Sequence, residues 1–256
     1  MGRARVVVLT GALAGASLIG IPLQWLALRL SPAAAARIPH LYHRLVNRVL
    51  GVRRTVHGDL ATQRPLLLVC NHVSWLDITV LSAVAPVSFV AKSEVARWPV
   101  FGLFAKLQRS IFVDRQRRTA TAGVTAEMAA RLSAGDAVVL FAEGTSSNGG
   151  RVLPFRSALL GAVREALAGS EAVWVQPVAI RYRGSNGLPY GRSDAPRLAW
   201  YGDMDMLPHL RGMLAHERPD AEIRFGAPVS VSADTDRKTL TRDLESAVRA
   251  LFHARG

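Results

Sequence analysis

Residues 66–77 read LLLVCNHVSWLD, a continuous apolar run followed at once by polar side chains. Five successive apolar residues after Pro65 predict a strand that is buried on both faces, as in a sheet covered by helices on each side. Ser74 and Asp77 have the residue types and spacing of a helix N-cap followed by an acidic residue at the N3 position. The stretch therefore predicts a strand, a short turn and a helix.

Short apolar runs and helical patterns alternate through the rest of the chain. Further strands are predicted over residues 53–58, 88–91, 111–113, 137–141, 173–179, 198–201 and 222–225. Helices are predicted over residues 40–50, 75–84, 119–133, 157–168 and 237–254. Alternation of this kind is typical of an α/β fold. We expect a mixed sheet flanked by helices, with no internal repeat and no long linker.

The composition combines high apolar content with strong positive charge. The chain has 256 residues, of which 50% are hydrophobic, and 32 Lys and Arg against 19 Asp and Glu give a net charge of +13. The apolar content excludes a disordered chain. A single cysteine, Cys70, excludes an internal disulfide framework and a cysteine-rich zinc site. The positive charge fits two kinds of partner: nucleic acid and an anionic membrane surface.

The N-terminal segment favours the membrane. Residues 6–28 carry no charge, and about 20 such residues cross the hydrocarbon layer as a helix. A cleaved signal peptide, whose apolar region is shorter, is the alternative. We expect a retained membrane anchor over residues 1–36 and a globular domain over residues 37–256. Pro22 would kink a helix here, so a re-entrant insertion into one leaflet stays open.

Flanking arginines predict the orientation of the anchor. Two arginines precede the apolar run, and six follow it within a short distance: Arg29, Arg37, Arg44, Arg48, Arg53 and Arg54. The positive-inside bias then puts the domain on the cytoplasmic side of the inner membrane. Nucleic acid is not expected as a partner, because it would explain the charge but not the uncharged run.

His72 and Asp77 form the candidate catalytic pair. Five residues apart on one helix they would be rotated by about 140°, so they meet only if His72 lies in the turn and Asp77 in the first helical turn. Open α/β sheets bind ligands at this carboxyl end of a strand. A carboxylate beside an imidazole fixes its tautomer and stabilises the imidazolium. The alternative is that Ser74 and Asp77 only cap the helix. No metal site is predicted.

Two further polar groups follow predicted strands. Arg115 comes after residues 111–113 and can bind phosphate with two parallel hydrogen bonds, or form a salt bridge with its neighbour Asp114. Another polar group follows residues 137–141 and consists of Glu143, Gly144, Thr145 and Ser146. By itself, the group after residues 137–141 is more typical of a plain turn than of a binding site.

In their order and spacing these blocks resemble the glycerolipid acyltransferase family, best known for 1-acyl-glycerol-3-phosphate acyltransferases. The first block matches the family's N-H-x-S-x-x-D pattern, which contains the H-x4-D motif, at Asn71, His72, Ser74 and Asp77. The second matches V-D-R at residues 113–115. The third is similar to F-P-E-G-T-R-S, and retains Phe141, Glu143, Gly144 and Thr145. A fourth, V-x-P-V, lies at residues 175–178, and Lys92 also has a family counterpart.

The resemblance implies transfer of an acyl group to the free hydroxyl of a lysolipid. His72 would act as general base with Asp77 orienting it, without a bound cofactor. The acyl group would come from acyl-CoA or acyl carrier protein, which are co-substrates. The residues expected to bind substrate are Asn71, Ser74, Lys92, Arg115, Glu143, Gly144, Thr145 and Ser146.

Two positions depart from the family pattern. Ala142 replaces a proline, and Ser146 stands where an arginine associated with the acceptor's phosphate is common. Arg115, Arg151 or Arg156 are the candidates to compensate. The leading expectation is conversion of 1-acyl-glycerol-3-phosphate to phosphatidate. A lyso-ornithine lipid acceptor is the first alternative, and a non-catalytic membrane lipid-binding protein is the second.

Overall fold

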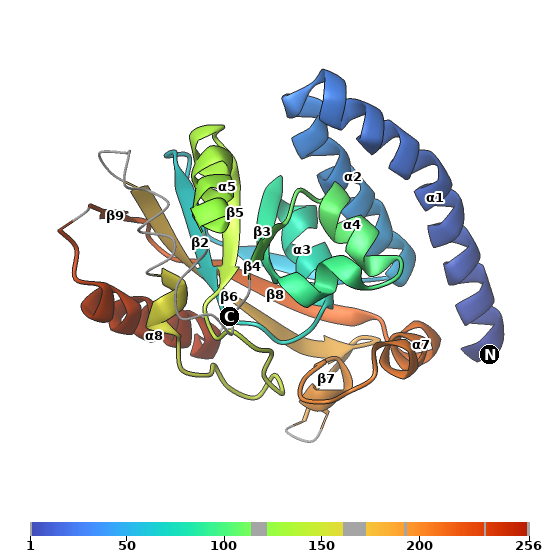
Figure 1. The fold of residues 1–256 in the computed structure, drawn as a ribbon. Coiled ribbons are helices and arrows are strands. Elements are labelled where there is room, and N and C mark those ends of the chain that lie inside the picture. The colour runs from blue at the N-terminus through green and yellow to red at the C-terminus, as the bar shows by residue number, and fades with distance from the viewer. Residues whose placement is uncertain (1, 114–121, 161–172, 192–193, 233, 255–256) are drawn as a thin grey trace.

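The computed structural model describes residues 2–113, 122–160, 173–191, 194–232 and 234–254 (Figure 1). Within these residues the strands form one nine-stranded mixed sheet in the order β1-β8-β6-β2-β5-β3-β4, with β7 and β9 also paired to β6. The α/β class with a mixed sheet is thus confirmed. The strands are β1 (Arg53–His57), β2 (Leu66–Cys70), β3 (Val87–Lys92), β4 (Ile111–Val113), β5 (Ala137–Phe141), β6 (Val173–Ser185), β7 (Leu188–Pro189), β8 (Pro219–Phe225) and β9 (Val229–Val231).

Strand β2 lies in the middle of the sheet. It pairs in parallel with β5 on one side and β6 on the other, so that Cys70 is level with both Phe141 and Val178. Strand β3 is parallel to β5, and β4 is parallel to β3. The carboxyl ends of β2, β5 and β3 therefore meet at one edge of the sheet, and the polar residues that follow them are brought together there.

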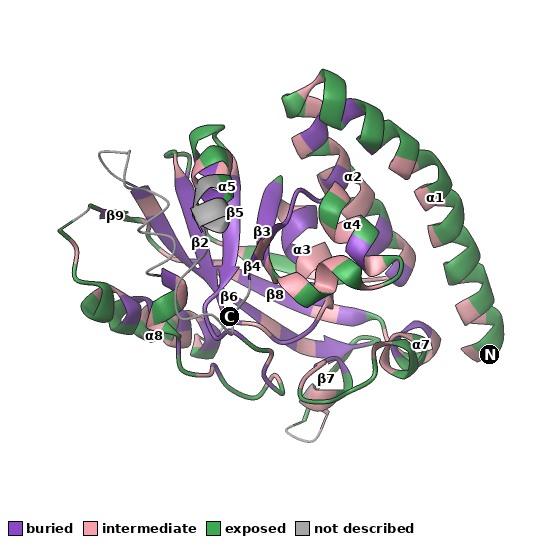
Figure 2. Ribbon diagram, viewed as in Figure 1, coloured by how far each residue is buried: buried purple, intermediate pink, exposed green. Residues whose placement is uncertain are grey.

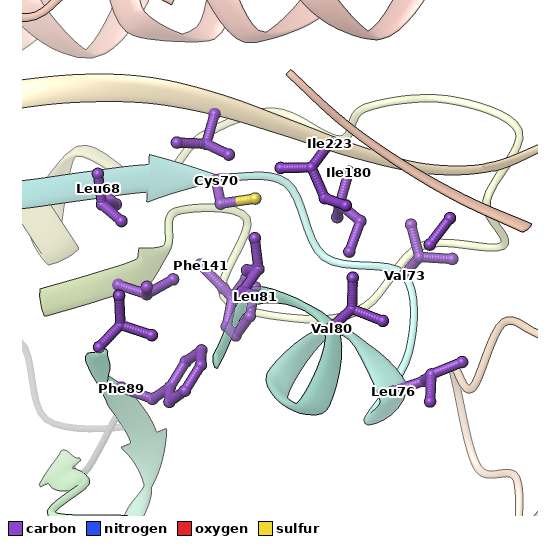
Figure 3. Packing of buried hydrophobic residues seen from close by; sticks show 14 of the residues in the cluster. Leu68, Cys70, Val73, Leu76, Val80, Leu81, Phe89, Phe141, Ile180 and Ile223 are labelled. Carbon is purple, nitrogen blue, oxygen red and sulfur yellow. The ribbon is translucent and has the colours of Figure 1, made fainter. Parts of the chain in front are cut away.

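Both faces of the sheet are covered by helices. Side chains alternate along β2, with Leu66, Leu68 and Cys70 in one apolar cluster and Leu67 and Val69 in another. The first cluster includes residues of α2 (Pro32–Leu50), α3 (Leu76–Val84) and α7 (Met206–His216), and the second includes residues of α5 (Ala122–Ser133) and α8 (Arg237–His253). Figure 2 shows the central strands buried, and Figure 3 shows α3 packed against the end of β2. Coverage on both faces explains the unbroken apolar run.

Helices α1 (Gly2–Leu30) and α2 form a hairpin at the edge of the molecule (Figure 1). The turn is fixed by Ser31, which accepts a hydrogen bond from the N–H of Ala34, and by Pro32 at the first helical position. Helix α1 lies along α2, and its N-terminal end contacts α7. It is long and apolar enough to cross a membrane. The predicted boundary between residues 36 and 37 falls inside α2.

A buried amide attaches α1 to the domain. Gln24 donates to the carbonyl oxygens of Ala35 in α2, at 2.9 Å, and Leu107 in α4 (Phe101–Leu107), at 2.7 Å. The apolar residues of α1 that face away from these contacts are exposed: Val7, Val8, Leu18, Ile19, Leu23, Trp25, Leu26, Leu28 and Leu30. Helix α1 is therefore both a part of the domain and an apolar surface.

Several elements differ from the sequence-based expectations. Residues 198–201 follow the short 3-10 helix η2 (Ala195–Arg197) and form no strand, although Leu198 and Ala199 are fully buried. The segment crosses the β2–α3 loop instead, with a hydrogen bond from the N–H of Trp200 to the carbonyl of Val73. Strand β6 extends to Ser185, because its second half pairs antiparallel with β8. Of the helix predicted over 157–168, residues 157–160 are helical and the rest lie outside the described residues.

Other helices follow the expectations more closely. The predicted helices 75–84 and 237–254 correspond to α3 and α8, and residues 40–50 form the second half of α2. Helix α5 begins at Ala122, while residues 119–121 lie outside the described part. Helices α4 and α7 and the 3-10 helix η1 (Ser93–Arg97) were not predicted.

Candidate active site

The loop between β2 and α3 holds His72 against Asp77. The Nδ1 atom of His72 lies 2.8 Å from Oδ2 of Asp77, which is in the first turn of α3. A carboxylate accepts this hydrogen bond, so Nδ1 carries the proton and Nε2 keeps its lone pair. Nε2 has no hydrogen bond to any described residue, and 16% of the His72 side chain is exposed. The imidazole is thus oriented to accept a proton from outside.

Asp77 is fully buried and accepts hydrogen bonds at both carboxylate oxygens. Oδ2 also accepts from the backbone N–H groups of Val73, at 2.7 Å, and Ser74, at 3.0 Å. Oδ1 accepts from the hydroxyl of Tyr182 at 2.7 Å. A buried carboxylate is tolerated only when such donors replace water. The arrangement fixes the orientation of Asp77 and, through it, that of His72.

Tyr182 is the residue of this site that sequence reasoning missed. It lies in the second half of β6 and is buried. Burial, with the charge of Asp77 close by, raises the pKa of Tyr182 well above its usual value, so the hydroxyl remains a donor. The predicted strand ended at residue 179. Continuing its alternation past Ile180 would have placed Tyr182 on the same face as Val178 and shown it as a candidate.

The ring of His72 also packs against an aromatic side chain. It stacks on Phe141, the last residue of β5, with ring centroids 4.0 Å apart and planes 16° from parallel. The carbonyl of His72 accepts a hydrogen bond from the N–H of Ser147 at 2.8 Å. The loop that follows β5 is therefore attached to the loop that carries His72.

Asn71 anchors the same loop to β6. Its side-chain amide donates to the carbonyl of Ile180 at 2.9 Å, and its oxygen accepts from the N–H of Ile180 at 2.8 Å. The residue is fully buried. Asn71 was predicted to contact substrate. In the structure its side chain instead forms two hydrogen bonds with the backbone of β6, as a neighbouring strand would.

Ser74 does not cap α3 as we expected. Its hydroxyl is buried and has no hydrogen-bond partner among the described residues. The prediction of a serine cap was wrong, because the N–H of Asp77 donates to the backbone carbonyl of Ser74 and not to its hydroxyl. The carboxylate of Asp77 in turn reaches back and accepts from the N–H of Ser74. In a capping box the serine hydroxyl and the acidic side chain each accept from the other residue's N–H. Here only the hydrogen bond to the acidic side chain forms.

Glu143 and Gly144 form the turn after β5. Glu143 is 2% exposed, and its Oε1 accepts from the N–H of Leu153 at 2.9 Å. Burial raises the pKa of Glu143 to about 8, and that hydrogen bond opposes the rise. Gly144 has φ +71°, and a Cβ there would lie 2.8 Å from Cδ of Arg156. The bare glycine therefore allows the exposed Arg156 side chain to lie over the turn.

The other predicted binding residues have different surroundings. The hydroxyl of Ser146 donates to the carbonyl of Trp200, which ties this loop to the segment after η2. Thr145 is exposed, and Lys92 is exposed at the end of β3. Arg115, together with Asp114, lies outside the described residues. The carboxyl edge thus collects the predicted residues of the first and third blocks, with Lys92 at a neighbouring strand end.

Cys70 is a core residue and no nucleophile. It is fully buried, and burial together with the charge of Asp77 raises the pKa of its thiol well above the usual value. The thiol therefore stays protonated, and a protonated thiol is a poor nucleophile. The described residues contain no cluster of His, Cys, Asp and Glu that could hold a metal ion.

The imidazole of His72, backed by the buried carboxylate of Asp77, lies beside the Glu143–Gly144 turn. Known proteins that are similar to this chain show which family it belongs to. The chain belongs to the Acyltransferase family, whose model matches residues 53–181. A relative from Brucella abortus, named lyso-ornithine lipid O-acyltransferase, is 51% identical over 99% of this chain and 96% of its own length. The protein is therefore an acyltransferase that acts on lysolipids.

Further relatives are more distant. A lyso-ornithine lipid O-acyltransferase from Rhizobium meliloti is 43% identical over 93% of this chain and 82% of the relative. A 1-acyl-sn-glycerol-3-phosphate acyltransferase from Neisseria gonorrhoeae is 30% identical over 76% of this chain and 72% of the relative. The crystal structure of PlsC from Thermotoga maritima, described as an LPA acyltransferase, has a TM-score of 0.67 at 20% identity, and the likeness covers 100% of this chain and 99% of that one. This last likeness supports the fold.

We predict that Glu143→Gln changes how stability depends on pH. Folding raises the pKa of Glu143 from 4.5 to about 8, so the folded protein keeps a proton that the unfolded chain releases. The contribution of Glu143 is then fully present below 4.5 and is lost as pH rises through 8. Thermal unfolding in detergent should show the Tm of Glu143→Gln rising relative to wild type across that range. The exposed Glu127→Gln is the control, and a pH-independent difference for Glu143→Gln would contradict the prediction.

Proposed function

We propose that the protein is a lyso-ornithine lipid O-acyltransferase. The supporting observation is the 51% identity to a relative of that name over nearly the whole of both chains. Three further relatives with the same name each match over more than nine tenths of this chain. The 1-acyl-sn-glycerol-3-phosphate acyltransferase from Neisseria gonorrhoeae matches a smaller share at 30% identity. The alternative acceptor of the sequence analysis therefore replaces the leading one.

The surroundings of Ser146 support this acceptor. The family pattern has at this position an arginine that is associated with the acceptor's phosphate. Here a short hydroxyl side chain donates to the carbonyl of Trp200, so the position carries no charge. An ornithine head group contains an amine and a carboxylate and has no phosphate. An acceptor lipid with this head group would not need the arginine.

The proposed mechanism is direct attack of the lipid hydroxyl on an acyl thioester. Nε2 of His72 takes the hydroxyl proton while the oxygen forms a bond to the thioester carbonyl carbon. The C–S bond then breaks, and the proton passes from His72 to the leaving thiolate. Asp77 holds the Nδ1 proton and stabilises the imidazolium that forms in between. The donor is acyl-CoA or acyl carrier protein.

Helices α1 and α2 provide the proposed membrane contact. Gln24 near one end of α1 and Arg5 near the other both bond to the domain, and the exposed side between them is apolar. Both ends of α1 thus lie on the same body, which favours the re-entrant or surface-bound arrangement over a separate crossing. The excess of arginines after α1 supports the cytoplasmic leaflet of the inner membrane.

The acceptor is tested with purified protein, a labelled acyl donor and two lysolipids. We expect kcat/KM for lyso-ornithine lipid to exceed that for 1-acyl-glycerol-3-phosphate by about tenfold or more, because position 146 carries a serine in place of the arginine that is associated with the phosphate. Acyl-CoA and acyl carrier protein are compared as donors in parallel. Ser146→Arg should narrow the ratio by restoring a cation. A preference for the phosphate-bearing acceptor would refute the proposal.

His72→Ala should remove most of the activity. General base catalysis of this kind contributes about 10²- to 10⁴-fold, and the acceptor hydroxyl loses it entirely in this variant. Circular dichroism and vesicle binding should remain as in the wild type, because Asp77 keeps its three other hydrogen-bond donors. The matched control is His253→Ala, at an exposed position in α8, which should leave turnover unchanged. Substantial residual turnover in His72→Ala would remove His72 from the mechanism.

Tyr182→Phe should lower kcat by about ten- to a hundredfold, which corresponds to one hydrogen bond to a charged group. The KM values should be unaffected, because Tyr182 acts through Asp77 and touches no substrate. A Tyr–carboxylate pair elsewhere in the protein supplies the control, since Tyr190 donates to Oε2 of Glu217 at 2.8 Å. Tyr190→Phe should cost similar stability without changing kcat. If both variants lower stability and neither lowers kcat, Tyr182 is only structural.

A further inference from the structure

A groove of about 580 Å³ lies beside the N-terminal end of α1, where the C-terminal end of α2 meets the sheet. Its walls are the first turns of α1, the C-terminal end of α2 and the turn between β6 and β7. Four arginines line it: Arg5, Arg48, Arg53 and Arg218. The volume lies within the range of small-molecule sites in proteins.

Two glycines make room for the arginines along the walls. Gly51 ends α2 with φ +76°, and a Cβ there would lie 3.3 Å from Cγ of Arg218. Gly187 has φ +84°, and a Cβ there would lie 3.6 Å from an Nη atom of Arg53. Both positions require the left-handed backbone that glycine adopts without strain. The groove is therefore shaped by backbone turns as well as by side chains.

Two of the four arginines have structural partners. Arg5 donates to the carbonyl oxygens of Leu50, Leu214 and Glu217, which closes the ends of α2 and α7. Arg53 is paired with the carboxylate of Asp220. These contacts fix the floor and one wall of the groove, and Asp220 is the acidic group that offsets Arg53.

The remaining two arginines are uncompensated. Arg48 and Arg218 are exposed, and within the described residues neither guanidinium has a hydrogen bond or an ion pair. The carboxylate of Glu217 is nearby in sequence, and it accepts from Tyr190. On the same edge, burial and the charges of Arg44 and Arg48 lower the pKa of Arg54. Like charges are crowded here, and a bound anion would relieve their repulsion.

The groove also has an apolar side. Leu9 and Val49 are among its lining residues. Val7 and Val8, which directly precede Leu9 on α1, are 71% and 67% exposed. An anionic group between Arg48 and Arg218 would therefore have apolar surface beside it, continuous with the outer face of α1. This combination fits an amphipathic molecule and not a soluble ion.

We propose that this groove binds the phosphate head group of an anionic phospholipid from the bilayer, with its acyl chains along α1. Guanidinium groups form paired, charge-assisted hydrogen bonds with phosphate, which suits Arg48 and Arg218. The source is the bilayer because the proposed membrane contact of α1, on which this inference rests, brings the groove to the lipid surface. Bound lipid would also hold α7, whose His209 accepts a hydrogen bond from Trp75 beside the catalytic loop.

The test compares two double variants of equal charge. Arg48→Gln/Arg218→Gln alters the groove, and Arg237→Gln/Arg242→Gln removes two exposed arginines from α8. Binding of the full chain is measured to phosphatidylcholine vesicles with and without phosphatidylglycerol, at about 0.15 M salt, where long-range attraction is screened. We expect the groove variant to lose about tenfold in affinity for the anionic vesicles, while the α8 variant keeps it. Both should bind neutral vesicles equally.

Three results would overturn the proposal. Equal losses in both variants would mean attraction by net charge alone. If inorganic phosphate raises the Tm of the wild type as much as a short-chain, soluble phosphatidylglycerol does, the groove is a site for free phosphate. If the wild type binds acyl carrier protein and the groove variant does not, while lipid binding is unchanged, the groove binds a protein partner.

A further readout separates the groove from the membrane contact of α1. Short-chain phosphatidylglycerol needs no bilayer, so its selective stabilisation of the wild type over the groove variant supports the site even if vesicle binding fails. If the wild type then does not bind neutral vesicles, the result counts against the membrane contact of α1. Acceptor preference is measured independently in detergent, and the groove variant should retain basal turnover there.

Discussion

The buried charge of Asp77 is the constraint on which the site depends. A carboxylate with no exposure to water must receive hydrogen bonds from the protein, and four donors supply them: the imidazole, two backbone N–H groups and a tyrosine hydroxyl. Each donor has to be held in place by its own element. The geometry of the β2–α3 loop, the start of α3 and the second half of β6 are therefore linked through one side chain.

Strand β6 provides the support for this arrangement. Its first half pairs with β2, and its second half continues past the end of β2 and pairs with β8. The overhanging part presents Ile180 to Asn71 and Tyr182 to Asp77. Because these contacts come from a rigid strand, the imidazole has its orientation before substrate arrives. Preorganisation of this kind reduces the rearrangement needed during reaction.

The sequence predicted the parts that depend on local pattern. The run 66–70 indicated a strand covered on both faces, and helical rotation alone required His72 in the turn and Asp77 in the helix. Long-range pairing decided the rest. Tyr182 was not assigned to the site, because the predicted strand ended at residue 179 and the second half of β6 depends on its pairing with β8. Apolar residues 198–201 look like a strand, yet they bury Leu198 while crossing a loop. Ser74 does not form its predicted cap, because the N–H of Asp77 donates to the backbone carbonyl of Ser74 and not to its hydroxyl.

Gln24 bears on the order in which the protein matures. Its amide lies towards the C-terminal end of α1 and donates to the carbonyl oxygens of Ala35 and Leu107, the second of which is 83 residues further along the chain. While the chain is being synthesised, the amide has no such partner, and in hydrocarbon it would go unpaired at a cost of several kcal/mol. The contact with Leu107 can form only after residue 107 has been synthesised. Docking of α1 against the domain is therefore completed only when α4 is in place.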